Sequence, residues 1–246
     1  MGADETALRA LAHEARRAAR ATAGLSGRER DAALLSVRSA LVDARPAIEE
    51  ANRKDKRAAA EANLEAPMLK RLDLEGAKFE AMVAKLDEVI ALSDPLDSVT
   101  YAMQLDDGLE LYRVACPIGV LCVIFESRPE AAVQIAALSL KSANALILKG
   151  GREAAHTNRA LAEVMRAGLA ASSLPVGSIQ LVETRAQIGV LLGLHDCIDL
   201  IVPRGSNALV SSIMGATRIP VMGHADGICS MCVTGPVKMS LHSALS

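Results

Sequence analysis

Two charged residues stand where an apolar stretch of the sequence gives way to a helical pattern. Residues 118–125 carry no charge, and their length suits a buried parallel strand. Glu126 and Arg128 follow directly, and Pro129 suits the first turn of a helix because it has no N–H and its φ is already helical. Ligands of open α/β sheets bind beyond the carboxyl ends of the strands, so this pair is placed to contact one. The alternative is an ion pair that serves only the loop.

Two glycine-containing turns are candidates for binding a nucleotide-like ligand. The first is Lys149, Gly150 and Gly151, and the second is Arg204, Gly205 and Ser206. Glycine at a strand end allows the backbone to approach a ligand, and the N–H groups of the next helix favour an anion. Neither GxGxxG nor GxxxxGK[ST] occurs in the sequence, so the pattern indicates a nucleotide-like ligand without matching a standard dinucleotide or P-loop fingerprint.

The remaining chemistry-bearing residues give weaker signals. The five cysteines have irregular spacing, which is typical of a reduced protein without a disulfide framework. Cys229 and Cys232 form a single CxxC, which is half a zinc site at best, so we interpret them as buried apolar residues and predict no metal site. Cys122 falls inside the apolar run and is expected in the core. His224, which lies between Gly223 and Gly227 after a predicted strand, is the one histidine placed near the candidate site.

These turns require a sheet to bring them together. Short apolar runs alternate with helical patterns from residue 117 onward, which predicts an α/β fold with a doubly wound parallel sheet. We expect the three turns to converge on one edge of that sheet. The runs with strand character are 118–125, 144–149, 179–182, 197–202 and 219–222.

Residues 4–93 are predicted to be helical almost throughout and to form a layer packed on the sheet, with no catalytic role. Ser26 and Glu29 match a capping box that opens the second helix. Residues 109–114 alternate apolar and polar side chains, so the segment of about 106–116 is predicted to expose a hairpin strand. Such a strand is a plausible edge for homo-oligomerisation.

The composition argues against several classes of protein. The net charge is −2 with a pI of about 6.2, and aromatic residues make up only 2% of the chain, which argues against nucleic-acid binding. No apolar run reaches the roughly 18 residues of a membrane span, and the N-terminus lacks the features of a signal peptide. We therefore expect a cytoplasmic protein, with organellar targeting left open.

Longer motifs carry a resemblance to a known family. The segment ESRP occurs at 126–129, LKGG at 148–151, PRGS at 203–206 and IPVMGHADG at 219–227. In this order and spacing, the chain from about residue 5 to residue 232 resembles γ-glutamyl phosphate reductase, also called glutamate-5-semialdehyde dehydrogenase, and equally the reductase module of Δ1-pyrroline-5-carboxylate synthase. Ala143 departs from the glycine usual there, and its β-carbon is expected to be tolerated.

The resemblance implies an aldehyde-dehydrogenase fold with a cofactor domain, a catalytic domain and an oligomerisation hairpin. It implies NADPH-dependent reduction of L-glutamyl 5-phosphate to L-glutamate 5-semialdehyde, a step of proline biosynthesis that uses a cysteine thiolate. Lys149 matches the lysine that contacts the ribose, and Gly151 and Ser206 line the cofactor edge. Glu126 and Arg128 lie at the turn facing the reacting centre, where the planar guanidinium suits an acyl phosphate or a carboxylate.

The resemblance also implies that the nucleophilic cysteine lies beyond residue 232, and residues 233–246 diverge from the expected continuation. We therefore expect residues 1–232 to form an NADPH-binding domain, with the catalytic domain, the nucleophile and the return strand of the hairpin all absent. On this interpretation the chain by itself is inactive. Two alternatives are a non-catalytic nucleotide-binding module and an interaction subunit that binds through residues 109–114.

Overall fold

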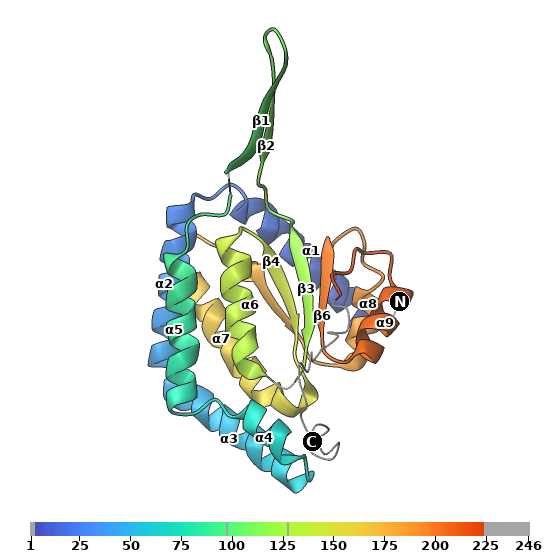
Figure 1. The fold of residues 1–246 in the computed structure, drawn as a ribbon. Coiled ribbons are helices and arrows are strands. Elements are labelled where there is room, and N and C mark those ends of the chain that lie inside the picture. The colour runs from blue at the N-terminus through green and yellow to red at the C-terminus, as the bar shows by residue number, and fades with distance from the viewer. Residues whose placement is uncertain (1–2, 97, 127, 224–246) are drawn as a thin grey trace, which may run out of the picture.

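The computed structural model describes residues 3–96, 98–126 and 128–223. A parallel sheet lies between two sets of helices, and a two-stranded hairpin projects from one end of this body (Figure 1). Among the helices described, none is both long enough and apolar enough to cross a membrane.

The sheet has four parallel strands in the order β5-β4-β3-β6. The chain builds outward from β3 to β4 and β5, and then returns to add β6 on the other side of β3. The strand order therefore reverses between β3 and β6, which is where doubly wound sheets bind their ligands. The predicted fold class is confirmed. The strands are β3 (Val120–Phe125), β4 (Ala145–Lys149), β5 (Ile179–Val182) and β6 (Leu200–Arg204).

Helices cover both faces of the sheet because each strand is apolar on both sides. In β3, Val123 and Phe125 pack into the core shared with α2, α5, α6 and α7, whereas Cys122 and Ile124 pack against α1, α8 and α9. The helices are α1 (Ala3–Thr22), α2 (Gly27–Asp43), α3 (Arg45–Glu61), α4 (Ala66–Leu72), α5 (Ala77–Ala91), α6 (Pro129–Lys141), α7 (Ala155–Ala170), α8 (Arg185–Leu191) and α9 (Asn207–Ala216), with short 3₁₀ turns η1 (Arg152–Ala154) and η2 (Val176–Ser178).

The N-terminal helices form the predicted layer. Ser26 and Glu29 make both hydrogen bonds of a capping box, which fixes the start of α2. Gly168 of α7 allows close packing between α2 and α7, since a β-carbon there would lie 2.6 Å from the Cα of Val37. These helices do more than cover the sheet, however, because α4 and α5 also line a cavity described below.

The hairpin corrects one prediction. The return strand expected to be missing is present in the chain: β1 (Val99–Asp106) pairs antiparallel with β2 (Leu109–Val114), and every residue of both strands is exposed. The sequence pattern of residues 99–106 could have predicted this strand, because apolar and polar residues alternate along it. The turn between the strands includes Gly108, whose φ of +75° favours glycine.

One further detail differs from the sequence predictions, and the conformation of Ala143 adds a cost that the sequence did not show. Residues 219–222 do not form a full strand, and only Val221 makes a bridge, to Ile201. Ala143 adopts a φ of +55°, a left-handed conformation that costs a residue with a β-carbon about 1–2 kcal/mol. The fold accepts that cost, and the buried Ala143 methyl offsets part of it.

Candidate functional site

The strand register brings the three candidate turns to one edge of the sheet. Lys149, the last residue of β4, pairs with Ile124 of β3, and Arg204, the last residue of β6, pairs with Phe125. Glu126 follows Phe125 at once. Because the strands are parallel neighbours, the turns after β4, β3 and β6 lie side by side at the point where the strand order reverses. The sequence analysis had placed Arg204 in the turn, but in the structure Arg204 is the last residue of the strand.

The turn after β6 packs closely against the turn after β3. A β-carbon at Gly205 would lie 2.7 Å from the Oε2 atom of Glu126 and 2.9 Å from the Cδ2 atom of Leu209. The Ser206 hydroxyl accepts a hydrogen bond from the N–H of Leu209 and so caps α9. This arrangement places the Glu126 carboxylate beside the start of α9.

The turn after β4 offers a polar crevice. A β-carbon at Gly150 would lie 2.1 Å from the Nδ2 atom of Asn158 and 3.2 Å from the Cζ atom of Phe125, so a larger residue would displace the buried Asn158 side chain. The Oδ1 atom of Asn158 is buried and has no hydrogen-bond partner among the described residues. Gly151, Ala155, Leu181, Val182 and Glu183 complete the lining. Sequence reasoning missed Asn158, because nothing in its local pattern distinguishes it from other polar residues of α7.

The residues at this edge of the sheet have the chemical properties that binding a dinucleotide requires. Lys149 supplies positive charge, the glycines allow close approach of the backbone, and Asn158 and Glu183 supply acceptors for hydroxyl groups. The crevice itself measures only about 10 Å³, so a ribose would have to lie across its mouth.

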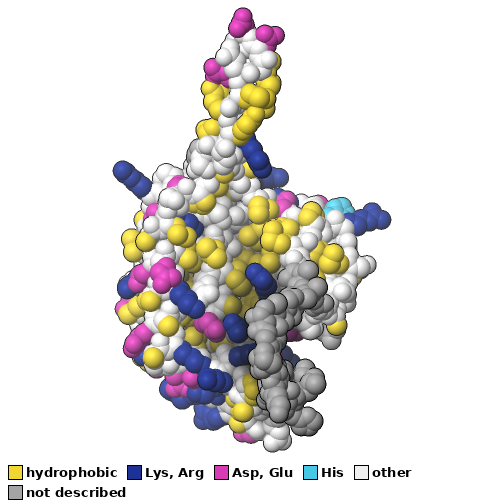
Figure 2. Space-filling view, in the orientation of Figure 1, with side chains coloured by type: hydrophobic (Ala, Val, Ile, Leu, Met, Phe, Trp, Pro, Cys, Tyr) yellow, Lys and Arg dark blue, Asp and Glu magenta, His cyan; other side chains and the backbone are white. Residues whose placement is uncertain are grey.

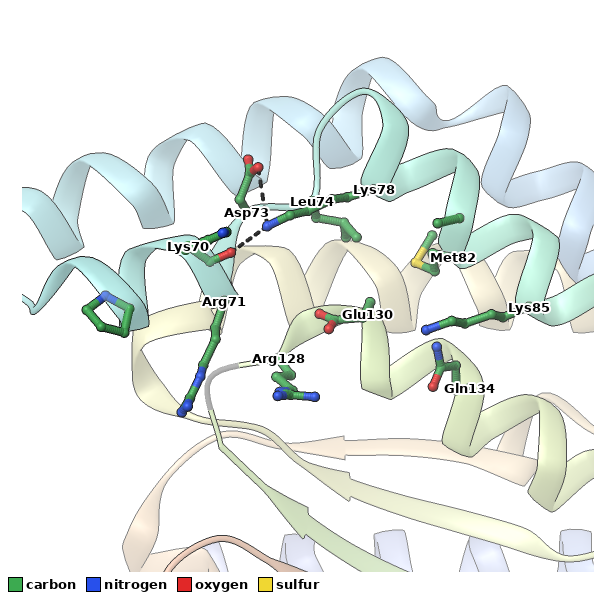
Figure 3. Close-up of a pocket in the computed structure, with 12 residues that line it drawn as sticks. Lys70, Arg71, Asp73, Leu74, Lys78, Met82, Lys85, Arg128, Glu130 and Gln134 are labelled. Atoms are coloured by element: carbon green, nitrogen blue, oxygen red, sulfur yellow. Dashed lines mark hydrogen bonds and ion pairs between the residues drawn. The ribbon is translucent and has the colours of Figure 1, made fainter. Parts of the chain in front are cut away.

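Besides the crevice after β4, a second cavity is lined by Arg128. It is a cavity of about 480 Å³ between α4, α5 and the first turns of α6 (Figure 3). Seven of its lining residues are charged, five of them cationic; these are Lys70, Arg71, Lys78, Lys85, Arg128, Asp73 and Glu130. The sequence interpretation missed α4 and α5 as site elements. In the sequence, the basic residues of these helices have the pattern of an ordinary solvent-exposed helix face. Only the packing of α6 opposite them shows that they line a cavity.

Most of this positive charge is not neutralised within the cavity. Lys78 pairs with Asp73 at 3.4 Å and also donates to the carbonyl of Lys70. Burial opposes ionisation of Asp73, but hydrogen bonds and charge from Lys56 and Lys78 outweigh it and hold the pKa of Asp73 below its ordinary value. Among the described residues, no ion pair engages Lys70, Arg71, Lys85 or Arg128. The cavity therefore favours an anionic ligand.

Two polar atoms of α6 at this cavity have no partner. The Oε2 atom of Glu130 and the Nε2 atom of Gln134 are buried, and neither makes a hydrogen bond in the described part of the chain. The two residues are four positions apart and therefore share one face of α6. Figure 3 shows Gln134 and Lys85 extending toward one another across the cavity.

The described thiols do not supply a nucleophile at this edge. Cys122 is buried inside β3, and burial raises its pKa to about 12. Burial also raises the pKa of Cys197, which precedes β6, and the exposed Cys116 precedes β3. Cys116 and Cys197 thus stand near the amino ends of the strands, opposite the candidate site. Cys229, Cys232 and His224 lie outside the described residues.

One group of side chains has the spacing of a metal site. His13, Asp196 and Cys197 present ligand atoms that all lie within 4.8 Å of one another. The Cys197 Sγ atom lies 3.4 Å from the Nδ1 atom of His13, and Arg9 approaches the Asp196 carboxylate at 3.5 Å. The group lies at the amino ends of the strands and belongs to neither hollow described above.

Comparisons with known proteins show that the chain is similar to known reductases. No protein-family model matches the chain. It is 49% identical to γ-glutamyl phosphate reductase of Saccharomyces cerevisiae over 226 residues, which are 90% of this chain and 50% of that protein. It is 46% identical to γ-glutamyl phosphate reductase 1 of Synechocystis over 235 residues, which are 96% of this chain and 54% of that protein.

The solved structures agree. The crystal structure of the S. cerevisiae reductase has a TM-score of 0.83 at 47% identity, covering 93% of this chain and 58% of that one. The Thermotoga maritima reductase has a TM-score of 0.84 at 31% identity, covering 87% of this chain and 52% of that one. A probable aldehyde dehydrogenase of Listeria monocytogenes shares the fold, with a TM-score of 0.66 at 16% identity. The chain spans about half the length of the curated relatives it matches.

Proposed function

Because this chain is a homologue of the γ-glutamyl phosphate reductases over about half of their length, we propose that it forms the nucleotide-binding lobe of such an enzyme. The reaction is NADPH-dependent reduction of L-glutamyl 5-phosphate to L-glutamate 5-semialdehyde, in proline biosynthesis. The single observation that carries the proposal is the register of β4, β3 and β6, which sets the Lys149, Glu126 and Arg204 turns side by side next to a cationic cavity.

Each turn has a proposed role in this reaction. Lys149, Gly150 and Gly151 bind the nucleotide, with Lys149 on the ribose and its phosphate, where a cation favours NADPH. Arg204, Gly205 and Ser206 bind the cofactor on the other side of β3. When bound, the nicotinamide supplies the hydride. Glu126 and Arg128, with His224, form the substrate side, and the Arg128 guanidinium binds the phosphate by two parallel hydrogen bonds.

The first test measures cofactor affinity. Replacing Lys149 with methionine should weaken NADPH binding about tenfold, because a hydrogen bond from a charged donor contributes about 1.5–3 kcal/mol. Binding is measured by titrating the enhanced fluorescence of NADPH. Lys54→Met, which removes an exposed lysine of α3, is the control and should leave the affinity unchanged. Equal affinity of Lys149→Met and the unaltered chain would refute the assignment.

The second test measures turnover by the 246-residue chain alone. We expect no oxidation of NADPH in the presence of freshly prepared L-glutamyl 5-phosphate. Reduction of an acyl phosphate through a thioester needs a thiolate at the site, and the described thiols lie elsewhere or have raised pKa values. NADPH binding without turnover is the expected pair of results, and steady turnover would contradict the proposal.

The exposed hairpin favours a second role, in self-association. Figure 2 shows apolar side chains along the projecting strands. One face of the hairpin is mostly apolar, with Met103 opposite Leu111 and with Arg113, opposite Tyr101, as its charged member. The other face mixes apolar and polar residues, with Ala102 opposite Tyr112 and Gln104 opposite Glu110. An isolated two-stranded hairpin is marginally stable in water, so we propose that a second subunit covers this face. The apolar residues of the face are Tyr101, Met103, Leu105, Leu109 and Leu111, each at least 42% exposed.

A single charge tests this role. We expect the chain to be an oligomer and Leu111→Lys to shift it toward monomer, because an ammonium group would be buried in the contact. The matched control is Gln104→Lys, which places the same charge on the other face of the hairpin. Sedimentation velocity over a range of concentrations distinguishes the two variants. Dissociation by both variants, or by neither, would be evidence against an interface on the apolar face.

A further inference from the structure

We propose that the cavity between α5 and α6 recognises the α-amino acid head group of the substrate through Glu130 and Gln134. This inference rests on the proposed function and assigns new residues to it. The acyl phosphate end would lie near Arg128, next to the sheet edge, and the head group would lie deeper along α6, near Lys85. The cavity volume of about 480 Å³ falls within the range of small-molecule sites.

The first observation is the pair of unpartnered atoms. Only three buried side-chain polar atoms lack a hydrogen bond among the described residues, and two of them, Glu130 Oε2 and Gln134 Nε2, belong to residues that line this cavity. Leaving such groups unsatisfied opposes folding. A ligand that donates to one and accepts from the other would remove both defects.

The second observation is the mixture of charges. The cavity presents four cations without ion pairs in the described structure, together with one carboxylate that also lacks a partner on one oxygen. A site for a simple dianion would not place a carboxylate among its cations. An α-amino acid carries an ammonium and a carboxylate on one carbon, and therefore needs both kinds of partner.

The assignment follows from donor and acceptor chemistry. The Glu130 carboxylate only accepts hydrogen bonds, so it binds the α-ammonium group. The Gln134 amide and the Lys85 ammonium donate, so they bind the α-carboxylate. Arg128 stands at the N-cap position of α6, nearest to β3, and is left for the phosphate. From the start of α6 onward, the residues then contact first the phosphate and next the ammonium and carboxylate groups, which is the order of these groups along the substrate.

The test uses stable phosphonates, since the acyl phosphate itself decomposes. The probe is L-2-amino-6-phosphonohexanoate, and its matched analogues are 6-phosphonohexanoate, which lacks the ammonium, and 5-aminopentylphosphonate, which lacks the carboxylate. Calorimetry with the full 246-residue chain should show that each omission weakens binding by about tenfold, as expected for one charge-assisted hydrogen bond.

Two variants assign the contacts. Glu130→Gln should reduce the preference for the aminated probe over 6-phosphonohexanoate to below about threefold, while the affinity for 6-phosphonohexanoate stays unchanged. Gln134→Met should likewise reduce only the preference for the carboxylated probe. Thermal melting of each variant checks that it is folded. The comparison of the three probes on the unaltered chain does not depend on any variant.

Several outcomes would overturn the proposal. The first is equal affinity of the unaltered chain for all three probes, and the second is no measurable binding of the amino acid probe. The third is a loss of affinity in Glu130→Gln that is equal for all three probes. NADPH titrations on the same proteins separate this inference from the proposed function. Normal NADPH binding with failed head-group discrimination rejects the assignment of Glu130 and Gln134 alone, whereas loss of NADPH binding by the unaltered chain rejects the proposed lobe.

Discussion

Replacing Asp55 with alanine should lower the free energy of unfolding by about 3 kcal/mol, because three buried or half-buried donors lose their acceptor at once. The Asp55 side chain leaves α3 and accepts from the N–H groups of His156 at 3.1 Å and Thr157 at 2.7 Å, and from the Thr157 hydroxyl at 2.6 Å. The α-helix that begins at Ala155 has no side-chain cap of its own. Asp55 therefore supplies the cap from another helix, and its charge also suits the helix N-terminus.

Urea denaturation measures this loss as a lower midpoint with an unchanged slope. Asp43→Ala, an exposed aspartate at the end of α2, is the control and should change the free energy by less than about 0.5 kcal/mol. A double-mutant cycle with Thr157→Val should show coupling of about 1 kcal/mol or more, since the two side chains are in contact. A loss in Asp55→Ala no larger than in the control would mean that solvent replaces the carboxylate without cost.

Arg30→Met should also lower the free energy of unfolding by about 3 kcal/mol, because the buried guanidinium satisfies two backbone carbonyls as well as the partly exposed Asp94 carboxylate, and these acceptors would lose their donor. Arg30 is only 2% exposed and donates both to Asp94, at 2.6 and 2.7 Å, and to the carbonyl of Lys141, at 3.1 Å. It also donates to the carbonyl of Leu25. One guanidinium thus connects the start of α2, the end of α6 and the segment after α5.

The control for Arg30 is Arg28→Met, because Arg28 is exposed on the same helix. Arg30→Lys should recover less than half of the loss, since an ammonium group cannot reproduce the planar set of donors. The measurement is again the midpoint and slope in urea. If lysine restored full stability, charge alone would explain the role of Arg30 and the geometry of the guanidinium would not matter.

Both predictions concern how the outer helices hold the site in place. Asp55 fixes the first turn of α7, which follows the Gly150–Gly151 turn after η1. Arg30 fixes α2 against the end of α6, the helix that bears Glu130 and Gln134. The N-terminal layer was expected only to cover the sheet. Its buried polar contacts instead position the helices that line both hollows, which local sequence patterns do not reveal.

The sequence by itself determined the fold class and the position of the candidate edge. The length and β-branched content of uncharged runs such as residues 118–125 favour strands buried on both faces, and such runs end in turns with charged residues or glycine. Parallel strands then bring those turns to one edge whatever the details of packing. For the same local reason, the capping box of Ser26 and Glu29 and the exposure of residues 109–114 were predictable.

Only the tertiary structure decided the cavity between α5 and α6 and the partners of its charges. Lys85 and Gln134 are 49 positions apart in the sequence, and nothing in the pattern of either helix shows that they face one another. The same holds for Asn52, Asp55 and Thr157, whose hydrogen bonds join two helices through buried side chains. A local pattern records which face of a helix is apolar, whereas the partner of a polar side chain depends on which distant element is packed against it.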